Sequence, residues 1–193
     1  MPYGADDDST TALALAARAG DVQAAEAFIA ATQRDVIRFL AHLTGHTDAE
    51  DLAQETFLRA MRALPGFEGR ASARTWLLAI ARHVAIDHLR SLTRRPRTAE
   101  LTDWAAAADG SRAAHGERFD EQVLINRLIS QLDPDRREAF VATQVLGLSY
   151  LEAAEVIGCP VGTIRSRVSR AREDLAAALS ARDTATHRHL RAV

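Results

Sequence analysis

The stretch LSYLEAAEVIGCPVGTIRSRVSRAREDL, residues 148–175, constrains the fold of this chain more than any other segment. Ser149 followed by Glu152 is a capping-box pattern, which predicts that a short helix begins near Tyr150 and ends before Gly158. A tight helix-turn-helix needs a small residue where its helices touch, a glycine in the turn and a branched apolar residue on the second helix. The chain has all three at the required spacing: Ala154, Gly158 and Ile164.

The second helix of this motif separates an apolar side from a basic one. Its apolar stripe has the spacing of a buried helix face: Ile164, Val168, Ala171 and Leu175. From Pro160 to Arg172 there are four arginines and no acid. The plain alternative is a solvated arginine-rich helix without a ligand. The glycine turn and the small polar residues between the arginines instead favour a helix that contacts DNA phosphates and base edges.

Composition favours an all-α protein of one or two small domains. Hydrophobic residues make up 47% of the 193 residues, aromatic residues only 5%, and strand-type alternation is almost absent. Cys159 is the single cysteine, so no disulfide can form within the chain and no cysteine-based metal site is available. We also expect no other metal and no cofactor. The sequence has neither an apolar run of about 18 residues nor an export signal, and we therefore expect a cytoplasmic protein.

Charge is strongly segregated along the chain, although the net charge is only −2. Residues 1–55 carry 10 acids and 3 arginines, whereas residues 56–95 carry 8 arginines and 2 acids. Residues 96–122 are acidic again, with 6 acids and 3 arginines. Two separate basic regions, one in residues 56–95 and one in the helix-turn-helix, indicate two contacts with nucleic acid.

A helix over residues 47–64 has two faces that are not simply polar and apolar. Thr47 and Glu50 form a second capping-box pattern at its start. The expected buried face comprises Leu52, Ala53, Thr56, Ala60 and Ala63. The opposite face mixes acids with two large apolar residues, Leu58 and Met61. Either this face docks a partner helix, or another element of the same domain covers it, and periodicity alone leaves both open.

The next segment is a loop followed by a long basic helix. Proline and glycines predict a loop over residues 65–70, and Ser72 and Thr75 can cap a helix that ends near Arg94. Its inward residues are expected to be Leu77, Ala81, Val84, Ala85, His88 and Leu92. Trp76 lies near the start of this helix, and an isolated tryptophan is more often a core anchor than a surface for stacking a base.

Three stretches now identify a family resemblance: DAEDLAQETFLRAMR at 48–62, ARTWLLAIARHVAIDHLR at 73–90 and LDPDRREAFVATQVLGLSYLEAAEVIGCPVGTIRSRVSRAR at 132–172. The chain resembles bacterial sigma factors of the extracytoplasmic-function (ECF) subgroup, actinobacterial type. The resemblance implies two small helical domains, sigma domain two over residues 11–95 and sigma domain four over residues 123–179, joined by a flexible acidic linker over 96–122. A disordered tail is expected at 1–10, and a second tail at 180–193.

The resemblance also implies partners and site residues. RNA polymerase core would bind through its β′ coiled coil and β flap, with the coiled coil on a face of Asp51, Gln54, Glu55, Leu58 and Met61. Promoter DNA would meet the minus-35 site through Thr163, Arg165, Ser166, Arg167, Ser169 and Arg170. The minus-10 site would use Phe67, Arg70, Arg74, Trp76, Arg82, His83 and Arg90. An anti-sigma factor is a further candidate partner.

Two departures from the family pattern affect promoter opening. Leu77 follows Trp76 where primary sigma factors carry a second aromatic residue, so the chain offers less stacking to unpaired bases and we predict narrow promoter choice. His83 stands where asparagine is expected. A conventional helix-turn-helix regulator with an N-terminal sensing or dimerisation domain is the alternative function. An enzyme is disfavoured because no glycine-rich phosphate loop, metal-ligand spacing or nucleophile with a placed base is found.

Overall fold

The computed structural model describes residues 3–94 and 116–190, with side chains over 8–94 and 123–181. Within these residues every regular element is a helix, which confirms the all-α prediction. The elements are α1 (Tyr3–Arg18), α2 (Val22–Thr44), α3 (Ala49–Ala63), η1 (Leu64–Gly66), α4 (Ala73–Arg94), α5 (Gly116–Ser130), α6 (Pro134–Phe140), the π-helical turn η3 (Val141–Val145), α7 (Tyr150–Ile157) and α8 (Val161–Leu190).

Helices α1 to α4 form an N-terminal bundle around large apolar side chains. Phe28, Val36, Phe39 and Leu40 of α2 are fully buried and pack against α1, α3 and α4. Glycines with positive φ end α1 and α2 where the sequence predicts breaks, at Gly20 and Gly45. The side chain of Asp21 caps α2 by accepting a hydrogen bond of 3.0 Å from the backbone N–H of Ala24.

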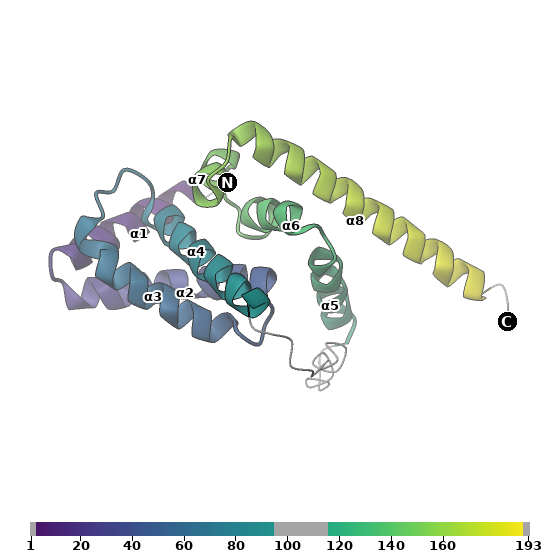
Figure 1. The fold of residues 1–193 in the computed structure, drawn as a ribbon, viewed down its shortest axis with the longest axis horizontal. Helices are drawn as coiled ribbons and strands as arrows, with labels where there is room; N and C mark the ends of the chain where they lie inside the picture. The colour runs from purple at the N-terminus through teal and green to yellow at the C-terminus, as the bar shows by residue number, and fades with distance from the viewer. Residues whose placement is uncertain (1–2, 95–115, 191–193) are drawn as a thin grey trace.

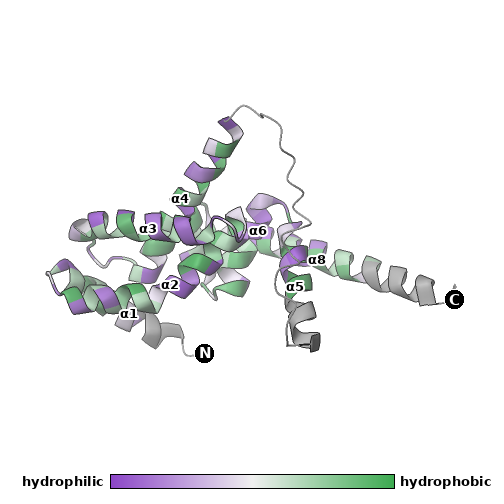
Figure 2. Ribbon diagram, turned by 90° about the horizontal axis from the view of Figure 1, so that it is seen from below, coloured by the Kyte–Doolittle hydropathy of each residue, from purple (hydrophilic) through white to green (hydrophobic). Residues whose placement is uncertain are grey.

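Three local features of this bundle differ from the sequence-based expectations. Helix α1 begins at Tyr3, inside the segment expected to be a disordered tail. Helix α3 begins at Ala49 after Asp48, and no side chain caps it, so the capping box predicted for Thr47 is wrong. Leu92 is 47% exposed, contrary to its expected inward position, because α4 extends beyond the bundle at its C-terminal end (Figure 2).

Helices α5 to α8 form a C-terminal bundle around the helix-turn-helix. Asp133 caps α6 by accepting hydrogen bonds from the backbone N–H groups of Asp135 and Arg136, as the Asp-Pro pair predicts. Helix α5 already begins at Gly116, inside the expected linker, of which residues 96–115 and Trp104 lie outside the described residues. Helix α8 runs to Leu190, well past the expected start of the tail at 180, and extends away from the rest of the molecule (Figure 1).

The two bundles pack together through α4. Helix α7 lies against α4, and α6 lies against α2, so that buried residues of both bundles form one continuous apolar cluster (Figure 1). The N-terminal part of α4 is accordingly buried on more than one side, with Ala73, Leu77, Leu78 and Ala81 at most 1% exposed. The chain therefore has two helical domains, as predicted, in direct contact with each other.

Candidate nucleic-acid interface

The helix-turn-helix has the local geometry that its sequence predicts. The Ser149 hydroxyl accepts a hydrogen bond of 3.2 Å from the Glu152 backbone N–H, and the Glu152 carboxylate accepts one of 2.7 Å from the Ser149 backbone N–H. Both halves of the capping box are thus present. Gly158 ends α7 with a φ of 71°, a conformation that glycine adopts without steric cost. This turn orients α8 relative to α7.

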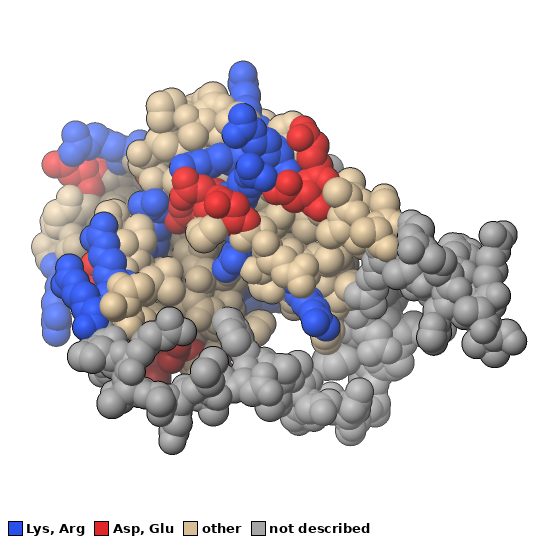
Figure 3. All heavy atoms as spheres, turned by 45° about the vertical axis from the view of Figure 1, so that its right-hand side comes forward, with Lys and Arg blue, Asp and Glu red and all other residues tan. Residues whose placement is uncertain are grey.

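Helix α8 buries one face and presents the other. Ile164, Val168 and Ala171 are at most 1% exposed and hold the start of α8 against the bundle. Arg165 and Arg170 lie on the exposed face. Within the described part of the chain, neither guanidinium group has a hydrogen bond or ion pair, so both are available to an external anion. In Figure 3 arginine side chains gather at the top of the molecule, with acidic side chains directly beside them.

The other predicted minus-35 residues are already engaged within the C-terminal bundle. Arg167 forms an ion pair with Asp135 and also points an N–H at the Cys159 sulfur, 3.9 Å away. The Ser169 hydroxyl donates to the Glu173 carboxylate at 3.1 Å. The Ser166 hydroxyl donates to the backbone carbonyl of Thr163 at 2.9 Å, and Thr163 itself is half-buried. The structure thus separates two unpaired arginines from four residues with local contacts.

The loop before α4 is held to the N-terminal bundle by its aromatic residue. Phe67 is only 4% exposed, and its ring centroid lies 4.9 Å from that of Trp76. Arg18 of α1 donates a hydrogen bond of 2.7 Å to the Phe67 carbonyl. Trp76 is half-buried against the core, in agreement with a core anchor. Arg70 remains exposed and pairs only with Glu68, at 3.0 Å.

Arg74 and Arg82 of α4 face the C-terminal bundle rather than open solvent. Arg74 pairs with Asp35 at 2.6 Å and also donates to the Leu146 carbonyl, at 2.6 Å. Arg82 donates two hydrogen bonds, of 2.7 and 3.3 Å, to the carboxylate of Glu138. The side chains of Arg82 and Glu138 are 21% and 9% exposed, so this pair is largely removed from water. In this arrangement Arg82, a predicted minus-10 residue, is therefore turned towards the C-terminal bundle and away from solvent.

The remaining minus-10 candidates lie further along α4 and are exposed. The His83 ring nitrogen Nδ1 lies 2.7 Å from the Ala79 carbonyl, and Arg90 lies about two helical turns beyond His83, near Asp87. Hydrogen bonds from Arg59 hold the pKa of Asp87 below its ordinary value. The predicted minus-10 residues are thus divided between a buried aromatic pair, two arginines at the domain contact and three exposed basic side chains.

The predicted polymerase-binding face on α3 is only partly exposed. Asp51 and Gln54 are exposed, and Leu58 keeps 48% of its surface accessible. Glu55 accepts a hydrogen bond of 2.8 Å from Arg59, whose other end reaches Asp87. Met61 is half-buried and packs against the apolar core of the bundle. Of the two apolar residues expected on this face, Leu58 alone is strongly exposed.

Sequence reasoning did not single out Asp35, Asp135 or Glu138, which pair with the predicted site arginines Arg74, Arg167 and Arg82. Their partners lie 32 to 56 residues away along the chain, too far for helical spacing to reveal. Among the residues with described positions, no group of three or more potential ligands could hold a metal ion. Nor does any described helix combine the length and apolar character required to cross a membrane.

Comparison with known families matches both bundles. The family model for Sigma-70 region 2 matches residues 28–95, and that for Sigma-70 region 4 matches residues 122–175. The chain is 56% identical over 172 residues to the probable RNA polymerase sigma-C factor of Mycobacterium bovis, a match that covers 89% of this chain and 92% of that protein. The chain belongs to the ECF sigma factors. It is thus a promoter-directing sigma factor of RNA polymerase, and it binds the polymerase and promoter DNA.

More distant relatives of this sigma factor share its fold. The ECF RNA polymerase sigma-E factor of Escherichia coli is 34% identical, with 80% of this chain and 85% of that protein covered. CnrH, solved with the cytosolic domain of CnrY, has a TM-score of 0.68 and 29% identity, and the match covers 90% of this chain and 98% of CnrH. RpoE of Bartonella quintana, solved with the anti-sigma factor NepR, has a TM-score of 0.65 and 31% identity over 80% of this chain and 96% of RpoE.

Proposed function

We propose that this sigma factor holds a promoter at two elements, with α8 on the minus-35 element and the loop before α4, together with α4, on the minus-10 element. The exposed and unpaired state of Arg165 and Arg170 supports the first contact. Arginine reads guanine through paired hydrogen bonds in the major groove, which an exposed helix face can enter. Arg70, His83 and Arg90 supply the exposed positive charge for the second contact.

The packed arrangement of the two bundles corresponds to the sigma factor before it engages a promoter. The observation that carries this proposal is the pairing of Arg74 and Arg82 with the C-terminal bundle, through Leu146 and Glu138. The Glu138 carboxylate of the other DNA-binding domain neutralises Arg82, and the Leu146 carbonyl of that domain accepts a hydrogen bond from Arg74, whose carboxylate partner Asp35 lies on α2. Separation of the bundles would release Arg82 and remove the Leu146 contact of Arg74, so that DNA binding by Arg82 at the minus-10 element and the packed arrangement exclude each other.

The polymerase contact lies on α3 and centres on Leu58, with Asp51 and Gln54 beside it. An exposed leucine flanked by polar residues suits a partner helix, for which the resemblance supplies the β′ coiled coil. The β flap would meet the C-terminal bundle. RpoE was solved with the anti-sigma factor NepR, and an anti-sigma factor for this chain is proposed by analogy.

Strand opening would rest on Trp76 with little help from neighbouring aromatics. Phe67 already stacks on Trp76, and Leu77 is buried, so only one aromatic side chain can be released without unpacking the core. We expect this sigma factor to open only promoters that melt easily. It would act in the cytoplasm, together with the polymerase, as a binding factor that performs no reaction of its own.

Transcription from a linear promoter fragment tests the proposed function. Purified core polymerase and the chain should together produce a transcript that core alone does not, and the chain should comigrate with core in gel filtration. A footprint of the complex should cover both promoter elements. If the chain instead binds the fragment tightly by itself and never joins core, it acts as a conventional regulator and the proposal fails.

A further inference from the structure

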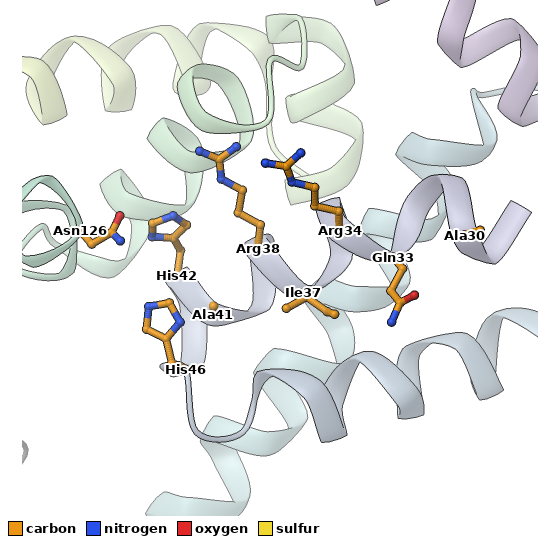
Figure 4. A pocket seen from close by; sticks show the side chains of 9 residues that line it. All are labelled: Ala30, Gln33, Arg34, Ile37, Arg38, Ala41, His42, His46 and Asn126. Carbon is orange, nitrogen blue, oxygen red and sulfur yellow. The ribbon is translucent and has the colours of Figure 1, made fainter. Parts of the chain in front are cut away.

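A groove of about 510 Å³ lies beside α2, at the contact between the two bundles (Figure 4). Seven of its nine lining residues belong to α2, and the other two are His46, just after α2, and Asn126 of α5. The groove therefore lies mainly on α2 and has one lining residue from the C-terminal bundle. Its volume falls within the range of small-molecule sites in proteins, roughly 300 to 1,000 Å³. None of the predicted promoter or polymerase residues lines it.

Three basic residues of α2 line this groove at a spacing of four, Arg34, Arg38 and His42, and His46 lies beyond Gly45, which ends the helix. Residues four apart in an α-helix lie on the same face, about 6 Å apart along the axis. Figure 4 shows the guanidinium groups of Arg34 and Arg38 projecting from the same side of α2. No aspartate or glutamate lines the groove, so its wall presents positive charge alone.

The arginines of this row differ from those at the domain contact. Arg74 and Arg82 are neutralised by Asp35 and Glu138. By contrast, within residues 8–94 and 123–181 no hydrogen bond or ion pair engages the guanidinium group of Arg34 or Arg38. Two cations in a concave site without a protein counterion are positioned to receive an anion from solution.

The pKa of His42 is affected by the same positive charges. Burial and the nearby positive charges of Arg38, His46 and Arg137 lower the pKa of His42 to about 4. Arg137, on α6, does not line the groove, and its guanidinium group donates hydrogen bonds to the carbonyls of Ser130 and Leu132. Positive groups of both bundles thus act on His42.

We propose that the groove binds a small molecule carrying a di- or triphosphate group, held by Arg34 and Arg38 on α2 and by Asn126 on α5. Guanidinium groups bind phosphate oxygens through paired hydrogen bonds, and two of them one helical turn apart match neighbouring phosphates of one ligand. The apolar side chains of Ile37 and Ala41 leave room for the rest of the molecule.

Because Asn126 belongs to the C-terminal bundle and Arg34 and Arg38 to the N-terminal one, a ligand that contacts all three binds best when the bundles are packed. A ligand with higher affinity for one arrangement shifts the population towards it. The phosphorylated ligand would therefore hold Arg74 and Arg82 at the domain contact and oppose promoter binding. This regulatory role rests on the proposed packed state, whereas ligand binding itself is measured without polymerase or DNA.

Isothermal titration of the full chain with sodium tripolyphosphate and with ATP, at constant ionic strength, tests the site. We expect saturable binding with one site per chain, weakened at least tenfold by Arg34→Gln or Arg38→Gln and weakened less by Arg38→Lys. Arg62→Gln is the matched control, since Arg62 is an exposed arginine on α3, away from the groove, and should leave binding unchanged. Tighter binding of ATP than of tripolyphosphate would show that the nucleoside contributes.

Two results would overturn the proposal. One is binding that depends on net charge alone. Sodium sulfate at the same ionic strength would then displace the ligand fully, or Arg62→Gln would weaken binding as much as the groove variants. The other is unchanged affinity in Arg34→Gln and Arg38→Gln, with circular dichroism showing that both variants are folded. Unchanged affinity in Asn126→Ala would overturn the bridging role of α5. A positive titration with no transcription from core would retain the site and reject the promoter function.

Discussion

At the scale of single residues, the structure divides the arginines of α8 into those with a partner in the protein and those without one in the described part of the chain. Arg165 is exposed and unpaired within the described chain, whereas Arg167 is held by Asp135 and the Cys159 sulfur. An unpaired arginine can bind a base edge without first breaking another contact. A paired one must exchange its carboxylate for the new contact, so it gains less on binding DNA. Sequence spacing places both beside the same face and cannot distinguish them.

We predict different effects for replacement of these two arginines by alanine. Arg165→Ala should cost about 1 to 3 kcal/mol of binding to the preferred promoter and relax discrimination at one minus-35 position. Arg167→Ala should instead lower the stability of the helix-turn-helix and change affinity similarly for all sequences. Holoenzyme binding to a set of duplexes with single minus-35 substitutions measures both. Equal losses for every duplex with Arg165→Ala would identify that residue as a phosphate contact.

At the scale of single helices, two similar capping patterns have opposite outcomes. Ser149 caps α7 through a complete capping box, whereas α3 begins after Asp48 without any side-chain cap. Both motifs satisfy the same sequence pattern. The difference arises because Gly45 and the turn after it set the entry of α3, and this places Asp48 rather than Thr47 at the first position before the helix.

Removal of the two hydroxyls should therefore have unequal effects on stability. Ser149→Ala should lower the free energy of unfolding by about 1 kcal/mol, since backbone N–H groups at the start of α7 lose their partner. Thr47→Ala is the matched control and should change it little. Chemical denaturation followed by circular dichroism provides the comparison. A loss for Thr47→Ala equal to that for Ser149→Ala would contradict the assignment of the caps.

On α3, Leu58 and Met61 are expected to have different roles: Leu58 docks the polymerase, and Met61 supports the fold. Leu58→Asp should abolish binding to core polymerase and leave the fold intact, because Leu58 is 48% exposed. Met61→Asp should lower the melting temperature as well, because Met61 packs on the core and a carboxylate there would lose its hydration. Gel filtration with core and thermal melting distinguish the two. A large loss of stability in Leu58→Asp would mean that Leu58 supports the fold.

At the scale of the whole molecule, the contact between the bundles links the availability of two DNA-binding surfaces. Arg82 and Glu138 form an ion pair that is largely shielded from water, and a pair of this kind is costly to break on one side only. Arg74 adds a second link through the Leu146 carbonyl. The exposed face of α8 with Arg165 and Arg170 lies outside this contact. Under the proposed function, the packed state would block the minus-10 contact and leave the minus-35 contact accessible.

Weakening this contact should open the molecule. Glu138→Gln removes the charge that holds Arg82 and should increase the radius of gyration measured by small-angle X-ray scattering. It should also raise the affinity of the free chain for minus-10 DNA severalfold. Asp174→Asn serves as control, because it removes an acid that pairs with Arg136 inside the C-terminal bundle, at 2.6 Å. Identical scattering of Glu138→Gln and the unchanged chain would show that apolar packing alone holds the bundles together.

The sequence by itself determined the features that depend on neighbouring residues. The capping box at Ser149, the turn at Gly158 and the buried stripe from Ile164 to Ala171 all follow from patterns within a few turns of helix. Such patterns are local because helix caps and helix faces are set by residues three or four positions apart. The two helical domains were implied by the resemblance of longer stretches to ECF sigma factors, which the family models confirm.

Only the tertiary structure decided which of the predicted site residues are accessible. Arg82 meets a carboxylate 56 residues away, and Arg74 meets a carbonyl 72 residues away. It also decided that Met61 and Phe67 are drawn into the core, and that Arg34 and Arg38 line a groove without a counterion. These outcomes depend on how the two helical bundles pack against each other, and helical periodicity holds no information about a contact between residues so distant along the chain.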